Sequence, residues 1–110
     1  MTYQVNESDW RLFRKRLAEW QENHMEALIE EYAAIIAGSG AASKKFWALE
    51  KRINADKHQT GVIARMSRSN MVPIINNLLL EGVITLDDLD GFSEELREQL
   101  AYVVGKNHKL

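Results

Sequence analysis

The chain has 110 residues, of which 45% are hydrophobic and 27% are charged, which is typical of a single globular domain over residues 1–110. It contains no cysteine, which excludes disulfides, thiolate metal sites and cysteine nucleophiles and favours a reducing cytoplasm. The longest aliphatic runs, at 33–37 and 78–80, fall far short of the roughly 20 residues that span a bilayer, and the segment MTYQVNESDW lacks the features of a secretion signal. We therefore expect a cytoplasmic protein without a membrane-spanning segment.

Charge is distributed unevenly along the chain. The net charge of −2 divides into −3 over residues 1–40, +5 over residues 41–75 and −4 over residues 76–110. One interpretation is that these segments neutralise each other within the fold or across an interface, and the alternative is a basic face for nucleic acid.

Residues 6–37 are predicted to form one long helix, around which the rest of the chain is organised. Asn6 is a suitable N-cap with Asp9 at the capping-box position, and Gly38 is expected to end the helix in a left-handed turn. The residues that follow a spacing close to 3.6, and so predict a buried stripe, are Trp10, Phe13, Leu17, Trp20, His24, Leu28, Tyr32 and Ile35.

A second helix is predicted from Ser43, as its cap, to residue 56. The GSGAA segment at 38–42 is short enough to join the two helices as an antiparallel hairpin. Phe46, Leu49 and Ile53 form the apolar stripe of this second helix, with Trp47 beside it. We expect its basic residues to face largely outward; they are Lys44, Lys45, Lys51 and Arg52.

The remaining half of the chain is predicted to form further short helices. Pro73 would cost a hydrogen bond inside a helix, so a break near residues 67–70 is preferred over one kinked, continuous helix. Thr85 and Asp88 form a capping box for a short helix, and Ser93 caps a last helix. The buried row of that last helix is Leu96, Leu100 and Val103. The fold class is all-α, a small helical bundle with one long N-terminal helix, a helical hairpin and a short C-terminal helix pair.

Four stretches of the sequence resemble a family of small bacterial proteins of similar length, namely EWQENHMEALIEEY, KFWALEKRINADK, ARMSRSNM and GVITLDDLDGFSEEL. The resemblance covers most of the chain. It implies no function and no site residues, because the family has no established activity. Some of its members are labelled "multidrug transporter", which conflicts with the absence of a membrane-spanning stretch here. Pro73 differs from the residues that usually follow the SNM sequence in this family.

No motif in the sequence predicts catalysis, a cofactor or a metal site. Residues 38–45, GSGAASKK, lack the spacing of a phosphate loop, and residues 86–97 lack the first and last ligands of a calcium loop. His24 lies on the apolar stripe, where a hydrogen-bonded, partly buried histidine is expected rather than a ligand. We therefore expect a non-enzymatic protein without cofactors, acting through an unidentified protein partner or through a second copy.

Two interaction hypotheses follow. A 32-residue helix is about 48 Å long, whereas a compact domain of this size is roughly 34 Å across, so the first helix should overhang its own domain and be covered by a second copy in a homodimer. The candidate interface residues are Trp10, Phe13, Leu17, Trp20, Leu28, Tyr32 and Ile36. A monomer whose first helix breaks near His24 is the alternative.

The second hypothesis is nucleic-acid binding or regulation through the basic middle segment. The helices at 86–98 are too acidic to contact phosphates. The candidate nucleic-acid contacts are therefore Lys44, Lys45, Lys51, Arg52, Lys57, Arg65 and Arg68.

Overall fold

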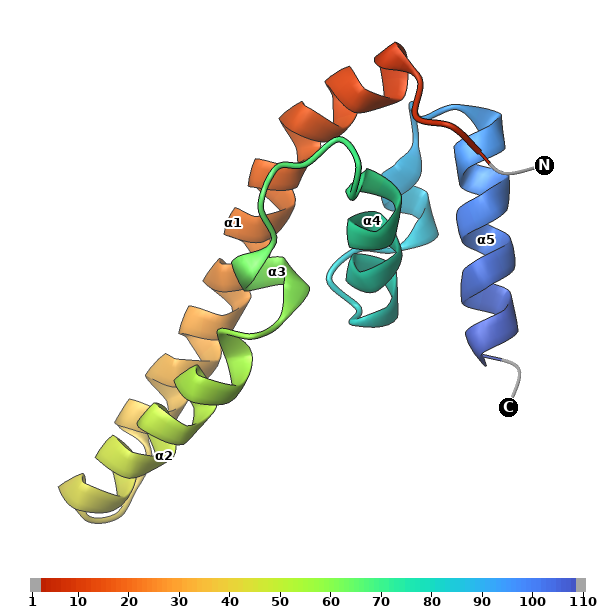
Figure 1. Ribbon diagram of the computed structural model, residues 1–110. Helices are drawn as coiled ribbons and strands as arrows, with labels where there is room; N and C mark the ends of the chain where they lie inside the picture. The colour runs from red at the N-terminus through yellow and green to blue at the C-terminus, as the bar shows by residue number, and fades with distance from the viewer. Residues whose placement is uncertain (1–2, 109–110) are drawn as a thin grey trace.

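The computed structural model describes residues 3–108, with side chains described as far as residue 102, and confirms an all-α fold. The described elements are α1 (Glu7–Ala37), α2 (Ala42–Asp56), α3 (Thr60–Ile63), α4 (Met71–Leu80), the 3-10 helix η1 (Leu86–Leu89) and α5 (Glu94–His108). Helix α1 runs along one side of the molecule (Figure 1), with α4, η1 and α5 beside its N-terminal half and α2 beside its C-terminal half. The molecule is elongated, with extents of 56 × 33 × 21 Å.

Helix α1 is continuous over 31 residues, as predicted, and the alternative of a break near His24 does not occur. The Asn6 side chain caps it by accepting a hydrogen bond from the Asp9 backbone N–H at 2.7 Å, as predicted. The predicted left-handed turn at Gly38 is wrong, because Gly38 is extended with φ −67° and ψ 171°. Gly40 has the positive φ of 119° instead, which only glycine adopts easily, and so allows the chain to reverse into α2.

The main hydrophobic cluster lies at the end of the molecule where the N-terminal half of α1 meets α4, η1 and α5, and Leu28 is buried apart from it, beside α2 and α3. The members of the cluster from α1 are Phe13, Leu17 and Trp20, and those from the other elements are Met71, Ile75, Leu78, Leu79, Ile84, Leu89, Phe92, Leu96 and Leu100. Leu96 and Leu100 confirm the predicted row of α5, whereas Val103 lies outside the described side chains.

Local signals in this half of the chain were predicted correctly. The chain breaks between α3 and α4, which puts Pro73 in the first turn of α4, where its missing N–H needs no partner within the helix. Thr85 and Asp88 form the capping box of η1. Arg16 holds η1 against α1 by donating hydrogen bonds to the carbonyl oxygens of Asp88 at 3.1 Å and Asp90 at 3.2 Å.

Helix α2 differs from its prediction in two ways. It begins at Ala42, with Ala41 in the cap position and no capping side chain, so Ser43 lies in the first turn and is not the cap. Arg52 does not face outward, because it turns to α1 and donates to Glu31 at 3.0 Å. The side of α2 that faces α1 therefore carries polar as well as apolar groups.

Candidate functional site

The hairpin formed by α1 and α2 extends beyond the core and leaves large apolar side chains in water. The only buried residue of α2 is Asp56. On α1, Ile29 is 61% exposed and Ile36 is 56% exposed, and on α2, Phe46 is 63% and Ile53 is 43% exposed. Monomeric proteins seldom leave so many large apolar side chains together in solvent, which marks this surface as a candidate interaction site.

These four exposed residues share one side of the hairpin, whereas Trp47 of α2, which is also 63% exposed, directly follows Phe46 and so lies about 100° away around the helix. Ile29 and Ile53 border the same groove between α1 and α2. Ile36 follows Ile29 by seven residues and Phe46 precedes Ile53 by seven, which is two helical turns in each case, so both lie on the same side as the groove. We call this surface the hairpin face and define it as Met25, Ile29, Ile36, Phe46 and Ile53.

The groove in the hairpin face has a volume of about 280 Å³ and lies where α1, α2 and α3 meet. Its walls are almost wholly apolar; they are formed by Met25, Leu28, Ile29, Tyr32, Ile53, Asp56, Lys57 and Val62. Such a surface has no convergent polar groups to orient a substrate, and it suits the apolar side chains of a protein partner.

The buried carboxylate of Asp56 lies in the wall of the groove and links the elements around it. Asp56 accepts hydrogen bonds from Tyr32 Oη at 2.6 Å, Gln59 Nε2 at 3.3 Å and Arg52 at 3.4 Å. Gln59 Oε1 in turn lies 2.8 Å from His24 Nε2. Because these bonds join α1 to α2 and to the start of α3, they hold the hairpin as one unit. His24 is half-buried and hydrogen-bonded, as predicted.

Burial raises the pKa of Tyr32 to about 12, and the hydrogen bond to Asp56 adds to the shift. The phenol therefore stays protonated at neutral pH and remains a donor. Its partner Asp56 is occupied by protein donors on both oxygens, which leaves this carboxylate with a structural role in the hairpin.

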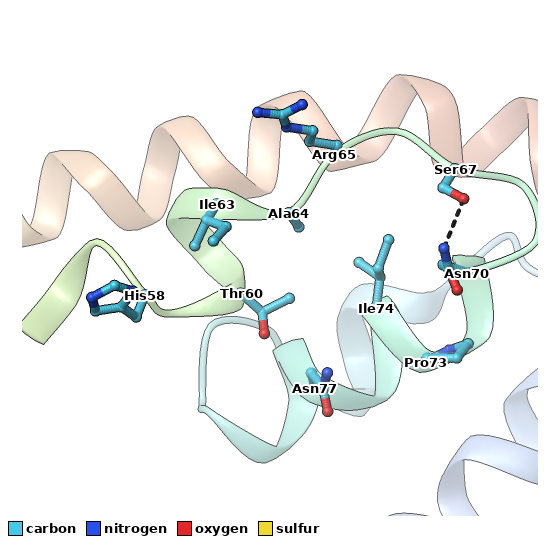
Figure 2. Close-up of a pocket in the computed structure, with 10 residues that line it drawn as sticks. All are labelled: His58, Thr60, Ile63, Ala64, Arg65, Ser67, Asn70, Pro73, Ile74 and Asn77. Atoms are coloured by element: carbon cyan, nitrogen blue, oxygen red, sulfur yellow. Dashed lines mark hydrogen bonds between the residues drawn. The ribbon is translucent and has the colours of Figure 1, made fainter.

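A second hollow, of about 450 Å³, lies between α3, residues 64–70 and α4. Figure 2 shows its polar side chains spread around the rim, with Arg65 and Asn77 on opposite sides and one hydrogen bond, from Asn70 to Ser67 at 3.1 Å. Because these groups do not converge on one point, they form neither a catalytic nor an anion-binding arrangement. Among the side chains that the structure describes, those of residues 3–102, no group of three is arranged to hold a metal ion.

Most of the interface residues predicted from the sequence serve the chain's own fold. Phe13, Leu17, Trp20 and Leu28 are buried within the chain, which removes them from a surface that a partner could contact. The prediction failed because a helical stripe shows which side of a helix seeks burial but not which element provides it. The sequence-derived set includes only one exposed member of the hairpin face, Ile36.

The two remaining predicted interface residues are partly covered. The guanidinium groups of Arg14 and Arg68 each lie 5.9 Å from the Trp10 ring, and the Tyr32 hydroxyl group is bonded to Asp56. The exposure of Phe46 and Ile53 was missed for a related reason, because both were assigned to a core stripe.

The basic residues predicted to contact nucleic acid are spread along the length of the molecule. Arg68 pairs with Glu7 at 2.8 Å, near the start of α1, whereas Lys44 and Lys45 lie in the first turn of α2, beside the end of α1. About 45 Å of helix separates these ends. Arg52 and Arg68 are already paired with carboxylates. The others are Lys51 on α2, Lys57 at the groove and Arg65 in the 64–70 segment. The seven residues are therefore spread along the molecule, and two of them are engaged in ion pairs.

Comparison with known proteins gives no match to a family model, to a curated protein or to a solved structure. None of the described helices is both long enough and apolar enough to cross a membrane. The hairpin face is therefore the feature on which a functional proposal rests.

Proposed function

We propose that this chain is a non-enzymatic self-association module, in which a second copy covers the hairpin face. The observation that carries the proposal is the exposure of Ile29, Ile36, Phe46 and Ile53 on one side of a two-helix hairpin. A hairpin alone is a single layer and has nothing on which to bury an apolar side. A second hairpin supplies the missing layer and makes a four-helix arrangement.

The size of the hairpin face suits such a pairing. Helix α2 with Lys57 spans 16 residues and is thus about 24 Å long, and two adjacent helices are about 20 Å wide. The face then covers roughly 480 Å² per copy, so a pair buries roughly 960 Å² in total. That area is close to the roughly 1,000 Å² that separates weak, transient interfaces from stable ones, so we expect a dimer of modest affinity.

The experiment that tests the proposal is a measurement of mass by light scattering across a range of micromolar concentrations. The expected mass is twice the 12.6 kDa of one chain. Ile36→Glu and Phe46→Glu each place a charge in the proposed interface and should shift the mass toward that of one chain.

The matched control is Leu86→Glu. Leu86 is 44% exposed and lies in η1, away from the hairpin, so this variant should keep the mass of the unmodified chain. A mass of 12.6 kDa for the unmodified chain at every concentration would refute self-association.

A further inference from the structure

We propose that the two hairpins pair in parallel, about a two-fold axis that runs along their length, so that α1 of each copy packs on α2 of its partner. This inference rests on the proposed self-association and adds the orientation of the second copy. It follows from which residues of the two helices lie at the same height and from how charge is divided between them.

The side chains of Glu31 and Arg52 meet at 3.0 Å, and Met25, Ile29, Ile53 and Lys57 line one groove, so these stretches of α1 and α2 lie at similar heights along the hairpin. Ile36 is five residues closer to the hairpin tip than Glu31, and residue 47 is five residues closer to it than Arg52. Ile36 therefore lies near the height of Phe46. Two residues farther from the tip than Glu31, Ile29 lies close to the level of Ile53. Each helix thus presents apolar residues at the same two heights.

Two face-to-face, two-fold arrangements are compatible with these apolar rows. A parallel pair sets α1 against the partner's α2, with Ile36 facing Phe46 and Ile29 facing Ile53. An antiparallel pair sets α1 against the partner's α1, with Ile36 facing Met25. Apolar contacts do not distinguish the two, because both bury the same hairpin face.

Charge distinguishes the two arrangements. Residues 21–37 of α1 contain four glutamates and no lysine or arginine, whereas residues 42–57 contain five basic and two acidic residues. The antiparallel pair places two acidic helices against each other. The parallel pair places each acidic helix on a basic one, and opposite potentials across an interface favour the pairing.

One charge pair is specific to the parallel arrangement. Glu26 precedes Ile29 by three residues and Lys57 follows Ile53 by four, so each lies about one turn from its isoleucine, at the edge of the hairpin face. Both lie five residues beyond the Glu31 and Arg52 pair, at the same height. The two-fold axis therefore brings Glu26 of one copy beside Lys57 of the other, twice per dimer.

Charge reversal tests this pair. Glu26→Lys and Lys57→Glu each turn two attractions into two repulsions and should each weaken the dimer by about tenfold in its dissociation constant. The variant carrying both changes should recover the original affinity, and an equimolar mixture of the two single variants should form heterodimers in preference to homodimers. Glu19→Lys is the matched control, because it makes the same change in charge on α1 at a height where α2 has no residue.

Site-specific cross-linking tests the same orientation without changing charge. The chain has no cysteine of its own, so single introduced cysteines report only the intended contact. A mixture of Ile36→Cys and Phe46→Cys chains should form a disulfide-linked heterodimer on mild oxidation. A mixture of Ile36→Cys and Met25→Cys chains, which reports the antiparallel pair, should not.

The outcomes separate the two proposals. Cross-linking of the first mixture together with rescue by the doubly reversed variant supports the parallel arrangement. A dimer by light scattering that cross-links only in the second mixture, or that shows no rescue, overturns the parallel arrangement and leaves self-association in place. A chain that is monomeric by light scattering overturns both.

Discussion

The Asp9 carboxylate joins the beginning of α1 to the beginning of α5. It is 1% exposed and accepts hydrogen bonds from Tyr3 Oη at 2.5 Å, Ser93 N at 2.7 Å and Ser93 Oγ at 2.5 Å. In the capping box expected from the sequence, this side chain would return to its own helix start. The structure uses it instead to bind a residue 84 positions away.

We expect Asp9→Asn to destabilise the fold by about 2–3 kcal/mol, because the amide presents N–H groups to donors and leaves buried groups unpaired. Chemical denaturation followed by circular dichroism measures the change. Glu7→Gln makes the same chemical substitution in the same turn on an exposed side chain and should have a much smaller effect. Equal losses in the two variants would contradict the role given to Asp9.

The raised pKa values of two tyrosines predict that the fold loses stability at high pH. Burial, with a hydrogen bond to Asp9 or to Asp56, raises the pKa values of Tyr3 and Tyr32 from 10.0 to about 12. Because the folded-state pKa lies above the unfolded one, the protonated phenols contribute stability that is complete below pH 10 and is lost as the pH rises toward about 12.

The free energy of unfolding, measured by denaturation between pH 9 and pH 12, should therefore fall less steeply in the Tyr3→Phe, Tyr32→Phe double variant than in the unmodified chain. Tyr102, which is 68% exposed, provides the control, and Tyr102→Phe should leave the slope unchanged. An unaltered slope in the double variant would exclude these phenols as the cause.

Helix α3 contacts α1 so closely that one of its residues has no room for a side chain. A Cβ atom on Gly61 would lie 2.6 Å from His24 Cδ2 and 2.9 Å from Val83 Cγ2. We expect Gly61→Ala to cost about 1–3 kcal/mol through overpacking. Thermal unfolding measures it, with Gly38→Ala as the control, since a Cβ there meets nothing nearer than 3.4 Å. Similar melting temperatures in the two variants would show that α3 can move aside.

Amide hydrogen exchange distinguishes the helices of the core from those of the hairpin. Met71, Ile75 and Leu78 of α4 are fully buried, so α4 should exchange slowly at any protein concentration. Helix α2 buries only Asp56 within its own chain and should exchange faster in dilute samples. If a second copy covers it, its protection should increase with concentration while that of α4 stays constant. Equal protection of α2 in dilute and concentrated samples would argue against this cover.

The sequence predicted where helices begin and end more accurately than which of their side chains are buried. The cap at Asn6, the break before Pro73 and the box at Thr85 depend on residues within a few positions, which a sequence displays directly. The burial of Phe13 and the exposure of Phe46 depend on where α4 and α5 pack, and helical spacing carries no information about that. The hairpin face therefore emerged only from the fold.

The whole molecule is more extended than a compact chain of its length. Its radius of gyration is 16.8 Å, against about 13 Å expected for 110 residues. This difference arises from the hairpin, which projects beyond the core (Figure 1).

Small-angle scattering should reflect this shape in the dimer. A parallel pair keeps a maximum dimension near the 56 Å of one copy. An antiparallel pair that shares only a hairpin of about 24 Å would reach roughly 90 Å. The Ile36→Glu variant, expected to be monomeric, supplies the reference curve. A dimer profile extending to the longer value would contradict the parallel arrangement.

The division of α1 between the hairpin and the core also sets the order in which the chain acquires structure during its synthesis. The hairpin needs contacts across 21 and 24 residues, as between Arg52 and Glu31 and between Tyr32 and Asp56. The core must wait for α5, because Asp9 binds Ser93, 84 residues later. At about 5–20 residues per second, ribosomes take about 2–7 seconds to add the residues between Asp56 and Ser93. Since helices form within microseconds, the residues of the hairpin are all available to fold seconds before the residues that close the core have been added.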